Sequence, residues 1–303
     1  MTKEPQSPSL DDYLAEKKKV IDGYLDQFLP KATTYPAVIH EAMRYSVFAG
    51  GKRIRPTLTL ATSDALDGEF EPSIHLACAL EMIHTYSLIH DDLPAMDNDD
   101  FRRGLPTCHR KYGEGIAILA GNGLLTTAFR VLTEIPGGAR VEQAKIQVIN
   151  SLCQAIGTQG GVIAGQVVDL TTQGKEFSRE ELEYIHSSKT AALIETSIHG
   201  AALLAGAPES ARERLRAFGR KIGLAFQIVD DILDVEGSAS ELGKRSGKDL
   251  LEKKATYPAL FGVEKSRLIA DQLIEEAIGE LAFLGSSGEI LKALAQFIAR
   301  RRF

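Results

Sequence analysis

Two clusters of aspartates are the residues most able to do chemistry, because each directly follows an apolar stretch of the chain. DDLPAMD at 91–97 follows LACALEMIHTYSLIH, and DDILD at 230–234 follows GLAFQIV. Each residue of an α-helix turns by about 100°, so this spacing gathers Asp230, Asp231 and Asp234 toward one side of a helix. Converging carboxylates of this kind are typical of cation-binding sites.

The first cluster has a wider spacing and contains a proline. In an uninterrupted helix, Asp97 would be rotated by about 120° from Asp91. Pro94 disfavours helical geometry at Leu93 and removes a backbone hydrogen-bond donor. We therefore expect the chain after Leu93 to bulge or to restart the helix, and to bring Asp97 back beside Asp91.

Acidic clusters at the ends of apolar helices need cations to balance them. Carboxylates held about 4 Å apart repel by about 4 kcal/mol at the effective dielectric of proteins, and burial adds a desolvation cost. Oxygen ligands favour Mg²⁺ shared with substrate phosphates, whereas Zn²⁺ would require a His or Cys spacing that is absent. A single acidic triplet is more often a solvated helix end, but two such triplets favour a metal site.

Basic residues flank both acidic clusters. They lie in GGKRIRP at 50–56, in FRRG at 101–104 and after the second cluster: Lys52, Arg53, Arg55, Arg102, Arg103, Lys244, Lys248 and Lys254. Arginines bind phosphate oxygens in pairs and lysines act as point charges. Each basic group taken alone is more often a solvated face. Together with the acidic clusters, the basic groups predict a diphosphate site.

The elements that must position these residues are predicted to be helices. From about Leu10 onward, apolar residues recur at helical spacing, and no sustained alternation indicates strands. The segments 76–90 and 220–235 are apolar nearly all round, which predicts helices buried inside a bundle. Breaks rich in Gly, Pro or Ser are too short for interdomain linkers. We predict an all-α protein with one helical domain at 10–303 and a disordered N-terminus at 1–9.

Composition narrows the function further. The 303 residues are 44% hydrophobic, as in a globular protein with a large core. The net charge of -6 argues against nucleic acid and anionic membrane surfaces as partners. Cys78, Cys108 and Cys153 lie far apart and are interpreted as packing residues. No apolar run approaches the roughly 20 residues of a membrane span, and no leader is visible, so we expect a cytoplasmic protein without stable membrane insertion.

These motifs together resemble the trans-isoprenyl diphosphate synthase family, most closely its bacterial-type farnesyl diphosphate synthases. In the family's order, the chain contains GGKRIRP, HTYSLIHDDLPAMDNDDFRRGLPTCH, GGVIAGQVVDL, IHSSKTAALIE, GLAFQIVDDILDVEG and LGKRSGKDLLEKKATYPAL. The resemblance implies the isoprenoid synthase fold, a helical bundle around a central cavity, and a homodimer. It also implies a prenyltransferase that condenses isopentenyl diphosphate head-to-tail with dimethylallyl and geranyl diphosphate to give farnesyl diphosphate.

The resemblance also implies roles for individual residues. About three Mg²⁺ ions would be held by Asp91, Asp92, Asp97, Asp230, Asp231 and Asp234. The allylic diphosphate would be bound by Arg102, Lys189, Lys244 and Lys254. The isopentenyl diphosphate would be bound by Gly51, Lys52, Arg55, His84 and Arg103. Thr190, Gln227 and the Lys189 carbonyl would direct dipoles toward the allylic carbocation. Catalysis would rest on Asp91, Asp97, Lys189, Thr190, Gln227 and Asp230.

Product length is predicted from two residues before the first cluster. Tyr86 lies about 7.5 Å along the helix axis from Asp91, where its ring can form the floor of the pocket, and Ser87 beside it leaves more room. The alternative is that Tyr86 is simply a core aromatic residue. An aromatic at this position and the two extra residues in DDLPAMD are similar to the farnesyl pattern.

Other interpretations of the sequence remain open. A geranyl or geranylgeranyl diphosphate synthase would differ in its cavity floor. A class I terpene cyclase would normally replace some acids of DDILD, and a non-catalytic synthase subunit usually loses one aspartate motif. Asn122 and Gly123 depart from the Asp-Ala usual in the family, which removes a charge near the cavity. Gln166 and Asp169 are expected at the cavity, while His90 and His109 are interpreted as structural residues.

Overall fold

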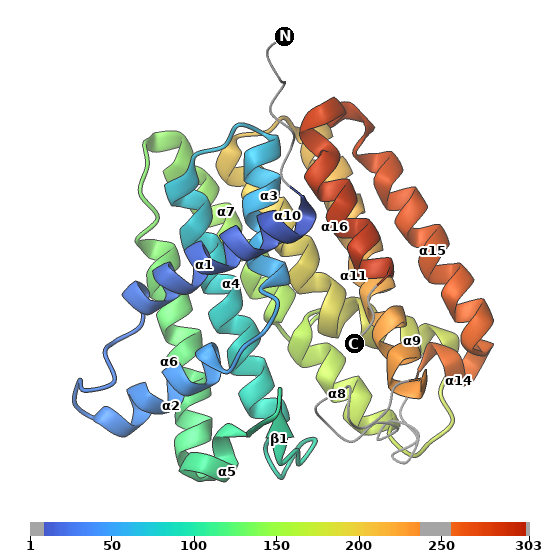
Figure 1. The fold of residues 1–303 in the computed structure, drawn as a ribbon. Helices are drawn as coiled ribbons and strands as arrows, with labels where there is room; N and C mark the ends of the chain where they lie inside the picture. Colours follow the sequence, from blue (N-terminus) through green and yellow to red (C-terminus); the bar gives the residue numbers. More distant parts are fainter. Residues whose placement is uncertain (1–8, 237–255, 301–303) are drawn as a thin grey trace.

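The structure, a computed structural model, describes residues 9–236 and 256–300. Within these ranges the regular secondary structure is helical apart from one short hairpin, which confirms the predicted all-α class (Figure 1). Residues 1–8 of the N-terminus predicted to be disordered, together with Lys244, Lys248 and Lys254, lie outside the described residues. The single domain at 10–303 stays a prediction.

Helices come before and after the hairpin in the sequence. Before it come α1 (Leu10–Phe28), α2 (Ala37–Phe48), α3 (Ile54–Ala65) and α4 (Phe70–Asp91). The hairpin pairs β1 (Phe101–Arg102) with β2 (Leu105–Pro106) in antiparallel register. After it come α5 (Cys108–Tyr112), α6 (Glu114–Thr133), α7 (Ala139–Ile156), α8 (Val162–Thr172) and α9 (Arg179–His186). They are followed by the π-helical turn η1 (Ser187–Ala191), α10 (Ala192–Ala205) and α11 (Glu209–Glu236). The last described elements are α14 (Tyr257–Phe261), α15 (Val263–Glu280), the 3₁₀ segment η2 (Ala282–Gly288) and α16 (Glu289–Ala299).

Helix α4 lies inside the bundle and carries the first acidic cluster at its end. It packs against α3, α6 and α10. Ile74, Leu76, Ala77 and Met82 are fully buried although they point in different directions around the helix. Residues 76–83 are buried throughout, but His84, Tyr86, Ser87, Leu88 and His90 are only half-buried, so the predicted burial on all sides holds for the first half of 76–90 alone. The hairpin lies beside the carboxyl end of α4, as Figure 1 shows.

Helix α11 carries the second acidic cluster, and its burial differs from the prediction. It packs against α10 and α15, and Phe218, Ile222 and Ile228 are fully buried. Phe226 and Gln227 are only half-buried, so 220–235 is not covered all round. The reason is that the side of α11 carrying Phe226 borders a cavity rather than another helix. Apolar composition alone does not distinguish a side that borders a cavity from one that packs against a neighbour.

Helix α6 is long and apolar enough to cross a membrane, judged by length and composition only. Ala117, Ala120 and Leu124 on this helix are nevertheless fully buried, and α6 packs against α4. The pair formed by α15 and the segment Ala282–Ala299 passes the same test, but it is bent by 92°. Because core helices commonly meet this criterion, we interpret α6 as a helix of the protein core.

One cysteine differs from its predicted packing role. Cys78 and Cys108 are buried as expected, but Cys153 on α7 is exposed. Leu152 is fully buried, and the next residue is rotated by about 100° toward the surface of the helix. Cys153 is therefore a surface residue.

Candidate active site

The chain turns sharply after α4 and returns Asp97 to the end of that helix. The Asp97 N–H donates to the Asp91 carbonyl oxygen at 2.8 Å, and the Asn98 N–H donates to the Leu93 carbonyl oxygen at 3.1 Å. Asn98 adopts a φ of 51°, the left-handed conformation that asparagine tolerates better than most residues. The return of Asp97 predicted from Pro94 is confirmed, and the segment forms a turn rather than a restarted helix.

Burial and repulsion between like charges disfavour the ionised form of the carboxylates at this acidic end of α4. Burial raises the pKa of Asp91 to about 6; Lys189 opposes the rise, and Asp97 and Asp92 add to it. Burial also raises the pKa of Asp92, although Arg102 counteracts the effect. Two adjacent carboxylates with raised pKa values fit a site built for a cation, because a bound cation would offset both desolvation and repulsion. The donor oxygens suit Mg²⁺.

Among the described residues, no three acidic, His or Cys side chains lie close enough together to hold a metal ion by themselves. Mg²⁺ usually takes one or two carboxylates from the protein and completes its coordination with water and substrate phosphates. The aspartates at this end of the bundle fit that pattern, in which the diphosphate supplies the remaining ligands.

The hairpin positions Arg102 against Asp92. Arg102 Nε donates to the two Asp92 carboxylate oxygens at 2.8 and 3.0 Å, and Nη2 donates at 2.5 Å. The Thr107 hydroxyl donates to the Asp99 carbonyl oxygen at 2.8 Å and so closes the loop around the hairpin. Roles for Asp92 as a metal ligand and for Arg102 as a diphosphate ligand remain predictions, and each would require this ion pair to be shared or opened.

The second cluster does not direct all its acids to one place. Asp231 is buried, and its Oδ2 lies 2.8 Å from His186 Nε2 on α9 and 3.0 Å from the Tyr257 backbone nitrogen. In this orientation the Asp231 carboxylate is bonded to α9 and α14, and its role as a metal ligand beside Asp230 stays a prediction. The step of about 100° between adjacent residues is enough to aim one carboxylate at α9 and α14 instead.

A π-helical turn presents Lys189 and Thr190 at the centre of the site. Lys189 Nζ donates to Asp169 Oδ2 on α8 at 2.7 Å. Burial alone would lower the pKa of Lys189, but Asp169, Asp91 and Asp97 outweigh it and raise the pKa, so the ammonium stays charged among acids. The Thr190 hydroxyl donates to Gln227 Oε1 at 2.7 Å. π-Turns of this kind occur frequently at functional sites.

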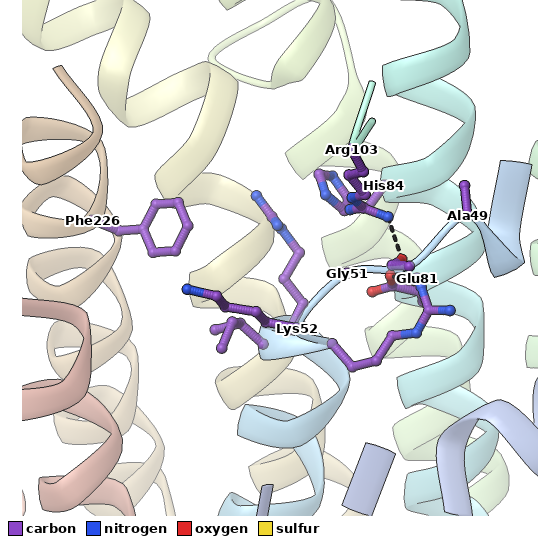
Figure 2. A pocket seen from close by; sticks show the side chains of 11 residues that line it. Ala49, Gly51, Lys52, Glu81, His84, Arg103 and Phe226 are labelled. Atoms are coloured by element: carbon purple, nitrogen blue, oxygen red, sulfur yellow. Dashed lines mark hydrogen bonds and ion pairs between the residues drawn. The ribbon is translucent and has the colours of Figure 1, made fainter. Parts of the chain in front are cut away.

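A basic cavity of about 550 Å³ lies between Lys52, His84 and Arg103 (Figure 2). It is lined by Ala49, Gly50, Gly51, Lys52, Arg53, Ile54, Arg55, Glu81, His84, Arg103 and Phe226. The structure thus brings together all five residues predicted to bind isopentenyl diphosphate. Burial and the neighbouring arginines hold the pKa of His84 well below its usual range, so its imidazole is neutral. Lys52 Nζ lies 5.6 Å from the centroid of the Phe297 ring on α16, which links the last helix to the cavity.

Arg53 differs from the other cations of GGKRIRP. Its guanidinium is buried and donates to Asp22 at 2.8 Å and to Glu81 at 2.6 Å, and its Nη2 donates to the Val47 carbonyl oxygen at 2.7 Å. It therefore ties α1, α3 and α4 together instead of offering charge to a phosphate. Sequence spacing could not reveal this, because Asp22 and Glu81 become neighbours only through tertiary packing.

Glycine is required where the loop before α3 meets Arg103. Gly51 has a φ of 116°, and a Cβ there would lie 2.7–2.9 Å from the guanidinium atoms of Arg103. Arg103 itself donates to the Gly50 carbonyl oxygen. We expect Gly51→Ala to raise the KM for isopentenyl diphosphate about tenfold or more, because Arg103 is displaced. Initial rates measured against isopentenyl diphosphate concentration will show this.

The matched control for this variant is Gly104→Ala. Gly104 also has a positive φ, of 76°, but its Cβ would meet no atom within 4 Å. It shares the backbone strain without the contact to Arg103, so it should leave that KM within about twofold. Equal KM values for both variants would show that backbone strain, and not the position of Arg103, is what matters.

The residues predicted to set product length lie on α4, in its second half. Tyr86 is half-buried, and its ring packs edge-on against His90 with the centroids 5.2 Å apart. His90 Nε2 lies 3.1 Å from the Ile118 carbonyl oxygen, and a Cβ on Gly121 would lie 2.2 Å from it, so His90 is structural as expected. The Ser87 hydroxyl donates to the His84 carbonyl oxygen at 2.9 Å.

The two departures from the family pattern also have positions in the structure. Asn122 is exposed on α6. A Cβ on Gly123 would lie 2.9 Å from Met43 Sδ, so the glycine allows α2 to pack closely. Gln166 is buried, and neither polar atom of its side-chain amide has a hydrogen-bond partner among the described residues. His186 and Phe226 are site residues that the sequence analysis missed, although both lie inside the motifs quoted for the resemblance.

Comparison with known proteins places this arrangement in a family. Residues 36–294 match the model of the polyprenyl synthetase family, and the chain belongs to that family. It is 47% identical over 304 aligned positions to the heterodimeric geranylgeranyl pyrophosphate synthase large subunit 1 of Arabidopsis thaliana, covering 99% of this chain and 81% of the relative. It is 45% identical to a geranylgeranyl diphosphate synthase of Cyanophora paradoxa, covering 95% of each chain.

The fold is that of the isoprenoid synthases. A geranyltransferase of Helicobacter pylori, solved with magnesium and isoprenyl diphosphate, superposes with a TM-score of 0.83 at 31% identity, over 97% of this chain and 98% of that one. The protein is therefore a Mg²⁺-dependent prenyltransferase that binds isopentenyl and allylic diphosphates. The names of the relatives fit the geranylgeranyl alternative better than the farnesyl assignment.

Proposed function

We propose that this enzyme extends allylic diphosphates with isopentenyl diphosphate as far as the twenty-carbon product, geranylgeranyl diphosphate. The observation that supports a two-substrate condensation is that α4 carries both His84 of the basic cavity and Asp91 of the acidic end. Seven residues along a helix correspond to about 10 Å. Two diphosphates held at these positions would bring an allylic carbon and a double bond close together.

Each residue group then has one task in the reaction. Bound Mg²⁺ would withdraw charge onto the leaving diphosphate. About three ions would be held by Asp91, Asp92, Asp97, Asp230 and Asp234. The allylic diphosphate would be held by Arg102, Lys189, Lys244 and Lys254. Lys52, Arg55, His84 and Arg103 would hold isopentenyl diphosphate. The allylic C–O bond breaks, the isopentenyl double bond attacks the cationic carbon, and the released diphosphate takes the proton. Thr190 and Gln227 would face the cation with uncharged dipoles.

The twenty-carbon product rests on the names of relatives at 45–47% identity. The fifteen-carbon product, farnesyl diphosphate, is the second candidate, because Tyr86 places a ring beside the end of α4. Incubation of the purified enzyme with labelled isopentenyl diphosphate and dimethylallyl, geranyl or farnesyl diphosphate, followed by chromatography, decides between them. Failure to extend farnesyl diphosphate would overturn the twenty-carbon proposal.

Tyr86→Ala tests whether the ring limits chain growth. Its side chain is half-buried next to His90, and removing it would open space below Asp91. We expect the main product to lengthen by at least one five-carbon unit, while Ser87→Phe shortens it. The readout is the product distribution at equal turnover. Unchanged products in both variants would show that the floor lies elsewhere.

We further propose that the enzyme is a homodimer that uses α6. Ile118 and Leu119 on this helix are 43% and 54% exposed, next to the exposed Asn122. An apolar surface of this kind favours contact with a second copy. Analytical ultracentrifugation of the wild type and of Leu119→Glu would test this, with a shift toward monomer expected for the variant. Cytoplasmic localisation stays a prediction.

A further inference from the structure

A chain of hydrogen bonds behind the reaction site connects α9, η1, α11 and α14. His186 and Asp231 are both almost fully buried, and their side chains meet at 2.8 Å between Nε2 and Oδ2. The Tyr257 N–H donates to the same oxygen at 3.0 Å. Gln227 Nε2 donates to Asp231 Oδ1 at 3.2 Å, and the Thr190 hydroxyl donates to Gln227 Oε1 at 2.7 Å. The chain therefore ends on the two residues predicted to face the carbocation.

The donors and acceptors that these groups offer determine which group donates in each hydrogen bond. His186 Nδ1 lies 2.9 Å from the Leu182 carbonyl oxygen, which can only accept, so Nδ1 carries a proton. One further proton lies between Nε2 and Asp231 Oδ2, and the Tyr257 N–H reaches that same oxygen. Asp231 Oδ1 is left as an acceptor. Only the amide nitrogen of Gln227 can face an acceptor, so its carbonyl oxygen must face Thr190.

The position of His186 is itself set by local structure. Helix α9 starts with a capping box in which Ser178 and Glu181 exchange hydrogen bonds between side chain and backbone. His186 ends this helix, and the π-helical turn begins with the next residue. His186 and Thr190 therefore lie at the two ends of the same short segment, one behind the site and one in it. The imidazole links that segment to Asp231 on α11.

We propose that His186 and Asp231 are positioning residues that fix the polarity of Gln227 and Thr190, so that oxygen lone pairs rather than N–H or O–H groups face the allylic carbocation. This proposal rests on the prenyl transfer and on the roles of Gln227 and Thr190 described under the proposed function. Dipoles that are already oriented stabilise developing charge without reorganisation. An inverted Gln227 amide would direct its positive end at a cation.

A double-mutant cycle tests this coupling. His186→Phe keeps a ring of similar shape and removes both nitrogens, so we expect kcat to fall about ten- to a hundredfold, with both KM values within about threefold of wild type. In a Gln227→Leu background, which is itself slow, the same change should lower kcat by less than about threefold, because no amide remains to be oriented. His186→Gln should recover much of the loss, because its amide N–H can replace Nε2.

The outcomes separate this proposal from the proposed function. If Gln227→Leu has wild-type kcat, the role of Gln227 in the proposed function fails. If Gln227→Leu is slow but His186→Phe lowers kcat equally in both backgrounds, only the positioning role is overturned. Thermal melting of each variant checks folding. Should His186→Phe not fold, the cycle is run with Asp231→Asn, which keeps the shape of the native side chain.

Asp231→Asn distinguishes a positioning residue from a metal ligand. The Tyr257 N–H needs an acceptor at the position of Oδ2, so the asparagine would keep its oxygen there. Its amide nitrogen would then lie at the position of Oδ1 and donate to Gln227, whose side-chain amide would have to turn over to accept. We expect a ten- to hundredfold lower kcat with Mg²⁺ affinity within about twofold of wild type, the latter measured by calorimetry in the presence of inorganic diphosphate. Asp91→Asn serves as the reference for a lost ligand. A loss of Mg²⁺ affinity in Asp231→Asn as large as in Asp91→Asn would overturn the proposal.

Discussion

Asp91→Asn is expected to lower kcat by about a thousandfold or more, because it removes a carboxylate from the acidic end of α4, where the leaving diphosphate must be held with Mg²⁺. The variant should remain at least as stable as the wild type. Burial raises the pKa of Asp91 to about 6, so the folded protein binds this proton more tightly than the unfolded chain does. Above that pH the ionised carboxylate costs stability, and the amide removes the cost.

Turnover at saturating substrates and thermal melting together check this expectation. Asp230→Ala on α11 should lose activity to a similar extent. Asp100→Asn is the matched control, because Asp100 lies in the same loop after α4 but pairs with the exposed Arg110. It should stay within about twofold of wild type. Near wild-type turnover of Asp91→Asn would contradict the mechanism.

Arg53→Met is expected to lower the free energy of unfolding by about 3–5 kcal/mol, because it leaves the buried Glu81 carboxylate without its partner. Arg53 also holds Asp22 on α1, and it is one of the residues that line the basic cavity. Urea unfolding followed by circular dichroism measures the loss. Any enzyme that remains folded should bind isopentenyl diphosphate with a KM close to wild type.

An exposed ion pair provides the comparison for Arg53. Arg130 pairs with Glu134 one turn along α6 at 2.7 Å, and about half of each side chain is exposed. Arg130→Met should therefore cost less than about 0.5 kcal/mol. If Arg53→Met were equally mild but raised the KM for isopentenyl diphosphate, Arg53 would belong with the phosphate ligands rather than with the core.

The local geometry around the first acidic cluster was predictable from the sequence. A largely apolar stretch predicts a buried helix, and α4 is buried except where its second half carries His84 at the cavity. Pro94 predicts a break, and the chain does turn there to return Asp97 to Asp91. These predictions succeed because they depend on residues a few positions apart, whose relation is determined by backbone sterics and helical rotation.

Contacts across the fold were not predictable in this way. In the sequence, nothing distinguishes Arg53 from the other basic residues of GGKRIRP, yet it is buried between Asp22 and Glu81. The sequence predicts the same role for Asp231 as for Asp230, yet the Asp231 carboxylate faces His186 on α9. In both cases the partner is far away in the sequence, and the direction of the side chain depends on which helix lies next to it.

The sequence by itself determined the helical class, the two acidic clusters with their flanking cations, and the family to which they belong. Tertiary structure alone decided which of those charges line a cavity and which are paired in the core. The physical reason is that the residue type sets what a group can bind, whereas burial and neighbouring charges set whether it is available. His84 shows this, because burial and then the neighbouring Arg55 and Arg103 hold the pKa of its imidazole well below the usual range.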